Sequence, residues 1–190
     1  MFGTLTDRII SSVIAVGSLI FPFISGIDPL FTNVNLNRSE NALVLSMYLD
    51  NCYTEELDNI LMSGQTITLR FQAELYEKNR PNVILSRQFY HTLRYNPLEK
   101  KYTIYYSENE RAEMCNTLRQ AHKYFSDVRR VEIIRPDDLI KNHTYYLQLS
   151  AYLEPVTFIG QKTDFNLMLY WNNKKPTIRT EEFDISIFYH

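Results

Sequence analysis

The chain has 190 residues, of which 45% are hydrophobic and 22% charged, with a formal net charge of −2 at pH 7. This length and composition predict one well-filled core, exclude a disordered chain, and give no polyanion-binding signature, so nucleic acid is not expected as a partner. Only five glycines are present, and without clustered glycines neither a dinucleotide fingerprint nor a phosphate loop can form.

The amino-terminal segment, residues 1–27, has the pattern of an export signal. Arg8 precedes a stretch without charge that runs from Ile9 to Ile27, and the small residues Ser25 and Gly26 lie near its end. The stretch also reaches the lower edge of bilayer-spanning length, about 17–25 residues, so a retained membrane anchor is an alternative to a cleaved signal. A buried core helix is a third interpretation. We expect an exported protein, periplasmic or anchored to the inner membrane and facing outward.

The chain after this segment is interpreted as a polar linker, residues 28–41, followed by a single β-rich domain, residues 42–190. A strand is predicted over 42–53, and Thr54 is expected to cap a short helix over 57–62. The clearest strand is 66–77, where apolar and polar residues alternate strictly, which indicates a sheet with one buried face and one wet face.

Two further strands are predicted over 83–95 and 101–107. Residues 78–82 supply the first turn, and Asn96-Pro97 starts the second, because proline presets its backbone angle and asparagine bonds its own main chain. Together with 66–77, these strands predict an antiparallel meander.

A helix is expected to follow, from a capping box at Ser107 and Glu110 to about Phe125. Cys115, Leu118, His122 and Phe125 repeat at helical spacing and would pack on the sheet. Further strands are predicted over 128–134, 143–153, 165–171 and 177–188. The expected fold is mainly β (α+β), an antiparallel β-sandwich-like sheet with one long amphipathic helix packed on it.

Catalytic chemistry finds no support in the pattern of residues. The four histidines share no metal-ligand spacing, no serine has a nucleophile-elbow context, and adjacent acids such as Glu181 and Glu182 point to opposite faces of a strand. We therefore expect a non-enzyme without metal or cofactor. Cys52 and Cys115 are interpreted as two buried thiols, with a disulfide as the alternative in an oxidising compartment.

Aromatic residues offer the one candidate surface, because the chain has fourteen tyrosines. Tyrosine also favours strands for packing reasons alone, burying its ring while the hydroxyl reaches a polar partner, so ordinary packing is the alternative. The candidate face for a ligand or a partner consists of Tyr90, Tyr105, Tyr145, Tyr152, Arg87 and Arg94.

Several short motifs of the chain match those of a known family. They are Arg87-Gln-Phe, Leu93-Arg-Tyr-Asn-Pro-Leu98, Lys101-Tyr102, the segment 112–124, Tyr145-Tyr-Leu-Gln-Leu149 and Trp171. Through these residues the chain resembles a family of exported, strand-rich bacterial proteins catalogued as a domain of unknown function, often encoded beside nitrogen-regulation-type sensor kinases. The likeness spans roughly residues 42–171, although the chain lacks the proline-rich passage that the family tends to carry before its final strands. The family has no known active site, so the resemblance implies export, fold and an envelope role only.

These observations lead to a first hypothesis of a non-catalytic envelope protein. It would meet the membrane through residues 1–27 and bind an unknown envelope protein, as an interaction or signalling-accessory module. The alternative is a carrier for an amphipathic or sugar ligand held by the tyrosine-rich face. A deep apolar pocket would favour the carrier, and a closed core with a flat patch would favour the partner-binding module.

Overall fold

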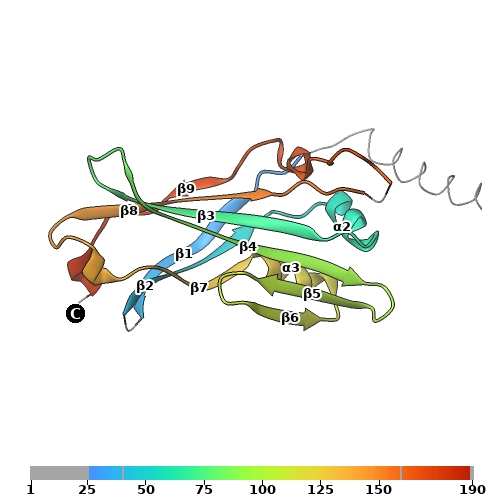
Figure 1. Ribbon diagram of the computed structural model, residues 1–190, viewed down its shortest axis with the longest axis horizontal. Coiled ribbons are helices and arrows are strands. Elements are labelled where there is room, and N and C mark those ends of the chain that lie inside the picture. The colour runs from blue at the N-terminus through green and yellow to red at the C-terminus, as the bar shows by residue number, and fades with distance from the viewer. Residues whose placement is uncertain (1–25, 40, 159, 189–190) are drawn as a thin grey trace, which may run out of the picture.

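The computed structural model describes residues 26–39, 41–158 and 160–188, which form mainly antiparallel strands (Figure 1). In this part of the chain the strands make one sheet of seven and one of three. Two α-helices, α2 (Glu55–Met62) and α3 (Leu118–Ser126), accompany them, with short 3-10 helices η1 (Pro136–Asp138), η2 (Leu167–Trp171) and η3 (Ile185–Phe188). The predicted mainly β class and antiparallel pairing are confirmed. A sandwich-like packing of the two sheets stays a prediction.

The seven-stranded sheet has the order β10-β8-β3-β4-β5-β6, and β9 also pairs with β8. The predicted meander is confirmed as β3-β4-β5, with β4 antiparallel to both neighbours. β3 lies in the middle and pairs with β4 and β8 along almost its whole length. The strands are β3 (Ile67–Glu77), β4 (Val83–Asn96), β5 (Lys101–Tyr106), β6 (Arg111–Cys115), β8 (Thr144–Leu153), β9 (Thr177–Arg179) and β10 (Phe183–Asp184).

The core lies on one face of this sheet, as the alternation in β3 predicts. Leu69, Phe71, Ala73 and Leu75 are at most 1% exposed, while the residues that alternate with them are only half-buried. The same apolar cluster includes side chains of the three-stranded sheet and of both helices. Burial of about 25 cal/mol per Å² of apolar surface makes this shared cluster the main stabilising term.

The three-stranded sheet has the order β1-β2-β7 and is made of β1 (Leu30–Ser39), β2 (Ala42–Asp50) and β7 (Asp127–Ile134). In Figure 1 these strands lie toward one end of the molecule, and α2, α3, β5 and β6 toward the other. α3 contacts β4, β5 and β6, while α2 contacts β4 and η2. Each helix starts at a threonine N-cap: Thr54 Oγ1 accepts from Leu57 N, and Thr117 Oγ1 accepts from Gln120 N, both at 3.3 Å.

The segment before β1 is attached to η2. Ile27 N donates to the Tyr170 carbonyl oxygen at 2.9 Å, and Asn172 Nδ2 donates to Asp28 Oδ1 at 3.2 Å. One residue before Asn172, the fully buried Trp171 donates from Nε1 to the carbonyl oxygen of Cys52 at 3.1 Å. η2 therefore joins the first described residues to the core.

The predicted long helix is wrong. Residues 107–110 form a turn, 111–115 form β6, and only 118–126 are helical. Ser107 Oγ accepts from Tyr90 N on β4 instead of capping a helix. Glu110 adopts a positive φ of 54°, which suits a hairpin turn and not a helical first turn. Pairing of β6 with the exposed edge of β5 outweighs the local capping pattern, and Thr117 provides the helix start.

Other boundaries also need correction. The stretch interpreted as a linker, 28–41, contains β1, which pairs with β2 from Leu30 to Ser39, so it belongs to the fold. The predicted strand 165–171 is mostly η2, and 177–188 is divided into β9, β10 and η3. In these segments short apolar runs cannot distinguish a strand from a tight helix.

The predicted export segment lies outside the described residues up to position 25. No helix within the described ranges combines the length and apolar composition needed to cross a membrane.

The Trp171 contact predicts a large loss of stability in Trp171→Phe. The change removes buried volume and leaves the Cys52 carbonyl without its donor, so we expect the free energy of unfolding to fall by about 2–4 kcal/mol. Urea denaturation measures it. Leu98→Ala is the control, because Leu98 is 94% exposed and its loss should change stability by less than about 0.5 kcal/mol. Similar losses in both variants would contradict the proposed role of Trp171.

Candidate functional site

The face of the seven-stranded sheet turned away from the core is called the outer face. It carries the alternate residues of β3, β4, β5 and β8, which are half-buried or exposed. The registers decide which of them meet, because residues directly opposite on paired strands share a face. The tyrosines of the outer face are Tyr76, Tyr90, Tyr105, Tyr146 and Tyr152.

Arg70 occupies the centre of the outer face. It lies opposite Tyr90 on β4 and opposite Tyr152 on β8. Its guanidinium carbon is 5.1 Å from the centroid of the Tyr90 ring, and its Nε pairs with Glu154. Lys175 Nζ lies 4.5 Å from the centroid of Tyr152. Two cations therefore stand over two tyrosine rings, and each such contact contributes about 0.5–1 kcal/mol at exposed sites.

A second group of this kind lies where β3, β8 and β9 meet. Tyr76 and Tyr146 stack with ring centroids 5.2 Å apart, and the Arg179 guanidinium carbon is 3.7 Å from the centroid of Tyr146. Arg179 and Lys78 both pair with Glu182, which lowers the pKa of that carboxyl, chiefly through the Lys78 hydrogen bond. These contacts hold the rings and the cations at fixed positions on the surface.

The structure brings together only part of the predicted face. Tyr90, Tyr105, Tyr152 and Arg94 do lie on the outer face, and the Tyr90 and Tyr105 rings are 6.2 Å apart. Tyr145 does not, because it has the core-facing parity in β8, is 1% exposed, and exchanges hydrogen bonds with the main chain of Ile140.

Arg87 also lies on the core-facing side of the sheet and not on the outer face. It lies opposite Ala73, a core-facing residue of β3, and its Nε donates to the Ile133 carbonyl oxygen of β7 at 3.2 Å. Arg87 thus links the two sheets. Conversely, Tyr76, Tyr146 and Arg70 were missed as members of the face. The alternation of residues 66–77 and 143–153 could have placed these three residues on the outer face. The contact of Arg179 with Tyr146 depends on the pairing of β9 with β8, which the sequence does not indicate.

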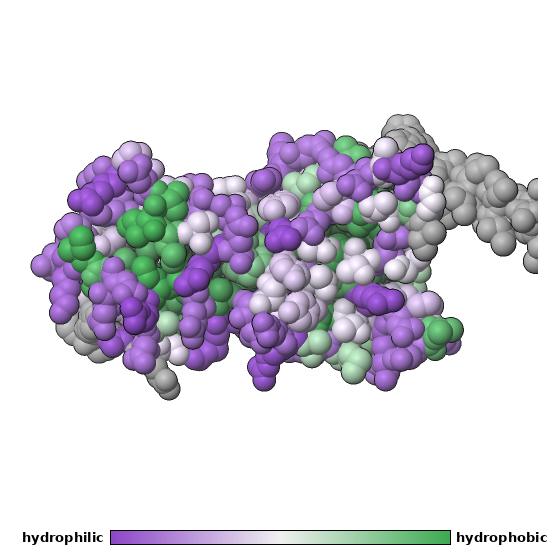
Figure 2. All heavy atoms as spheres, viewed as in Figure 1, coloured by the Kyte–Doolittle hydropathy of each residue, from purple (hydrophilic) through white to green (hydrophobic). Residues whose placement is uncertain are grey.

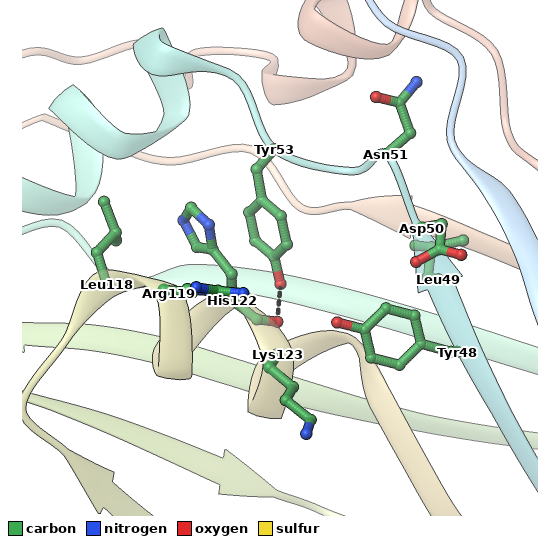
Figure 3. Close-up of a pocket in the computed structure, with 9 residues that line it drawn as sticks. All are labelled: Tyr48, Leu49, Asp50, Asn51, Tyr53, Leu118, Arg119, His122 and Lys123. Carbon is green, nitrogen blue, oxygen red and sulfur yellow. Dashed lines mark hydrogen bonds between the residues drawn. The ribbon is translucent and has the colours of Figure 1, made fainter.

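A groove of about 530 Å³ lies between the end of β2 and α3 (Figure 3). It opens beside both tyrosine and charged side chains, and a neighbouring groove of about 450 Å³ shares Tyr48, Asp50 and Lys123 with it. The residues that line the first groove are Tyr48, Leu49, Asp50, Asn51, Tyr53, Leu118, Arg119, His122 and Lys123.

His122 forms a fixed wall of this groove. Its Nε2 is 2.7 Å from Asp58 Oδ1, and its ring stacks on Tyr53 with centroids 3.8 Å apart and planes 9° apart. Tyr53 and Ser126 donate their hydroxyl hydrogens to the His122 carbonyl oxygen and not to the imidazole. The His122 ring therefore connects α2 to α3, and the two hydroxyl groups are committed to the main chain. Burial raises the pKa of Tyr53 well above its ordinary value.

A buried histidine–carboxylate pair lies beneath the sheet. His91 is 0% exposed; its Nδ1 is 2.7 Å from the Phe125 carbonyl oxygen and its Nε2 is 3.0 Å from Glu108 Oε1. The carbonyl can only accept, so Nδ1 donates. A neutral His91 then has an acceptor at Nε2, and a proton must lie between Nε2 and Glu108. Sequence reasoning missed this pair, because it assigned Glu108 to a helix.

Burial disfavours the reactive thiolate form of both cysteines, and the described residues contain no cluster of metal ligands. Cys52 and Cys115 are both free and buried, as the favoured interpretation expects. Burial raises the pKa of the Cys52 thiol from 9.0 to about 12. Within residues 26–188, apart from positions 40 and 159, no three His, Cys, Asp or Glu side chains are grouped to hold a metal ion.

Comparison with known proteins adds one match. A family model described as a domain of unknown function (DUF4390) matches residues 30–157. No curated protein and no solved structure matches the chain. The matched segment begins at β1 and ends just beyond β8, so it contains most strands of the outer face and the groove beside α3.

The proton shared by His91 and Glu108 predicts different outcomes for two variants. Glu108→Gln keeps a donor opposite Nε2, so we expect a loss of less than about 1 kcal/mol in the free energy of unfolding. Glu108→Ala leaves the ring nitrogen buried and unpaired, and we expect a loss of about 2–3 kcal/mol. Urea denaturation compares them, with the exposed Glu99→Ala as control. The interpretation fails if the glutamine variant is as unstable as the alanine variant.

The raised thiol pKa predicts that Cys52 resists alkylation. Only the thiolate reacts, so folded protein should leave Cys52 unmodified by iodoacetamide at neutral pH, whereas unfolded protein should take up the label at both cysteines. Peptide mass spectrometry measures both. Because the folded pKa lies above 9.0, the stabilisation from the buried thiol is complete below pH 9.0 and is lost as pH rises toward 12. Rapid labelling of Cys52 in the folded protein would contradict this prediction.

Proposed function

The chain belongs to the DUF4390 family of unknown function, and we propose that it is a non-catalytic, exported envelope protein that binds a partner protein through the outer face. The supporting observation is the set of cations lying over tyrosine rings on that face. These are Arg70 over Tyr90, Lys175 over Tyr152 and Arg179 over Tyr146.

The composition of the outer face favours a protein partner. Tyrosine and arginine are enriched at the centres of protein interfaces, because they combine a large apolar area with directed polar groups. Here Arg70 and Arg179 are held by Glu154 and Glu182, so the rings and cations lose little conformational freedom when a partner arrives. Basic groups on this face are paired with acidic ones, which suits a polar protein surface better than a polyanion.

The packing of the core favours this function over that of a carrier. Leu167, Tyr170 and Trp171 are fully buried and help to fill the space beneath the sheet. The grooves beside α3 are open at the surface, whereas a site for an amphipathic ligand encloses most of that ligand. A sugar or amphipathic ligand held on the tyrosine rings remains the alternative, and native mass spectrometry would then find a retained small molecule.

Export and a signalling role complete the proposal. The uncharged run from Ile9 to Ile27 after Arg8 supports passage of the chain across a membrane, as a signal peptide or a retained anchor. The resemblance to exported proteins encoded beside sensor kinases supports an accessory role in envelope signalling. Sandwich-like packing of the two sheets is part of the same proposal and would leave the outer face open to a partner.

The partner-binding role predicts a specific crosslinking pattern in the native host. A photo-crosslinking amino acid placed at Tyr90 or Tyr152 should give a discrete adduct with one protein, and placed at Leu98, in the distant β4–β5 turn, it should give none. Arg179→Glu should weaken the adduct at least several-fold, because it reverses a charge in the contact surface. Equal adducts at Leu98, or none at either tyrosine, would contradict the proposal.

Export predicts the behaviour of reporter fusions. Alkaline phosphatase fused after His190 should be active in cells, because the enzyme matures only outside the cytoplasm. Replacing Val13 and Ile14 by arginine should abolish that activity, since charge in the apolar run opposes membrane insertion by about 2.5–3.5 kcal/mol per residue. An inactive fusion of the unmodified chain, made at normal abundance, would contradict export.

A further inference from the structure

β4 is longer than the strand that covers one of its edges. Its 14 residues pair with β3 from Val83 to Leu93, but β5 covers the opposite edge only from His91 to Asn96. Ser107 extends that cover by one residue, because its backbone N–H donates to the Tyr90 carbonyl oxygen at 3.0 Å. Among the described residues no strand pairs with the remaining edge, residues 83–89, which we call the free edge.

The direction of the free backbone groups follows from Tyr90. Its carbonyl oxygen accepts from Ser107 N and its N–H donates to Ser107 Oγ, so both groups point away from β3. Backbone groups alternate in direction along a strand. The N–H and C=O groups of Ser86 and Gln88 therefore point outward at the free edge, whereas Ile84 lies at a β-bulge, where the register with β3 shifts. The side chains of Ile84, Ser86 and Gln88 are all exposed.

The outward backbone groups of the free edge are not shielded by lysine or proline, which many natural edge strands carry. The segment Val83-Ile-Leu-Ser-Arg-Gln-Phe89 has no proline and one charge. Arg87 has the core-facing parity and reaches β7, so its guanidinium does not lie over the outward groups. Val83 and Ile84 are 42% and 44% exposed, and Figure 2 shows hydrophobic residues gathered at this end of the molecule.

A second copy of the chain complements this edge. A twofold axis through Ser86 places Ser86 opposite Ser86 of the other copy and Ile84 opposite Gln88, with no charged residue among these pairs. The single charge, Arg87, then lies opposite Leu85, so the two arginines do not face each other. The Ser86 pair would exchange about two backbone hydrogen bonds, and the outward groups of Gln88 in each copy would be available for more.

We propose that two copies associate through the free edges of β4, antiparallel and centred on Ser86, and that the two seven-stranded sheets become one continuous sheet. This interface is separate from the centre of the outer face at Arg70, which stays open in the dimer. The competing outcome of the test is that a strand from a different protein pairs with the same edge.

Cysteine scanning of the full chain tests the register. In the proposed dimer the two Cα atoms at position 86 are about 5.5 Å apart, within the range of about 4.4–6.8 Å that a disulfide spans. Ser86→Cys should therefore form a covalent dimer rapidly under mild oxidation, seen on a non-reducing gel. Gln88→Cys is the matched control, because its two copies would be about 13 Å apart and should not crosslink.

A mixture of Ile84→Cys and Gln88→Cys should crosslink, since these positions face each other across the axis. Equal crosslinking of Ser86→Cys and Gln88→Cys would indicate random collision and overturn the proposal. It would also be overturned if Ser86→Cys, with an unchanged melting temperature, stayed monomeric or trapped a different protein.

Charge variants at the same position test association without a covalent bond. Ser86→Lys and Ser86→Asp each place like charges on the axis, and light scattering should find each variant at least tenfold weaker in dimerisation than the parent chain. Mixing the two variants should restore the dimer, because the pair then carries opposite charges. A parent chain that is monomeric at all accessible concentrations would overturn the proposal, and so would a mixture that stays dissociated.

Discussion

The arrangement of this protein depends on the alternation of buried and half-buried residues in β3. The strand pairs on both edges, with β4 and with β8, so its parity is imposed on both neighbours. A shift of one residue would turn Leu69 and Phe71 to solvent and put Arg70 in the core. The large apolar area buried on one side makes such a shift prohibitive, and the register of the whole sheet follows.

Because the register is fixed, the two faces of the seven-stranded sheet have different environments. The inner face shares one apolar cluster with α2, α3 and the three-stranded sheet, and it contains the buried His91–Glu108 pair. The outer face retains partly exposed rings and cations that need no further covering for stability. A surface of this kind can change its side chains for recognition while the buried residues of the same strands stay unchanged, which suits a binding module.

Sequence reasoning reached the parts of the fold that local chemistry determines. β3, β4 and β5 follow from period-two alternation and the Asn96-Pro97 turn, and α2 follows from its Thr54 cap. Sequence reasoning failed where a contact with a residue far away in the sequence determines the local structure. Ser107 is an example, because its hydroxyl accepts from Tyr90 N and does not cap a helix. Four of the six residues of the candidate face lie on the outer face. Parity alone excludes the other two, Tyr145 and Arg87, but Arg179 reaches Tyr146 only through the pairing of β9 with β8.

The attachment of Ile27 to η2 has a mechanical consequence. Any pull transmitted along the segment before β1 would reach the fold at the bond to Tyr170, next to Trp171, and not at a frayed strand end. Trp171 in turn donates a hydrogen bond to the carbonyl oxygen of Cys52, so the applied force would be shared between two regions that lie far apart in sequence. Breaking the bond between Ile27 and Tyr170 by force would therefore also strain the packing around Trp171.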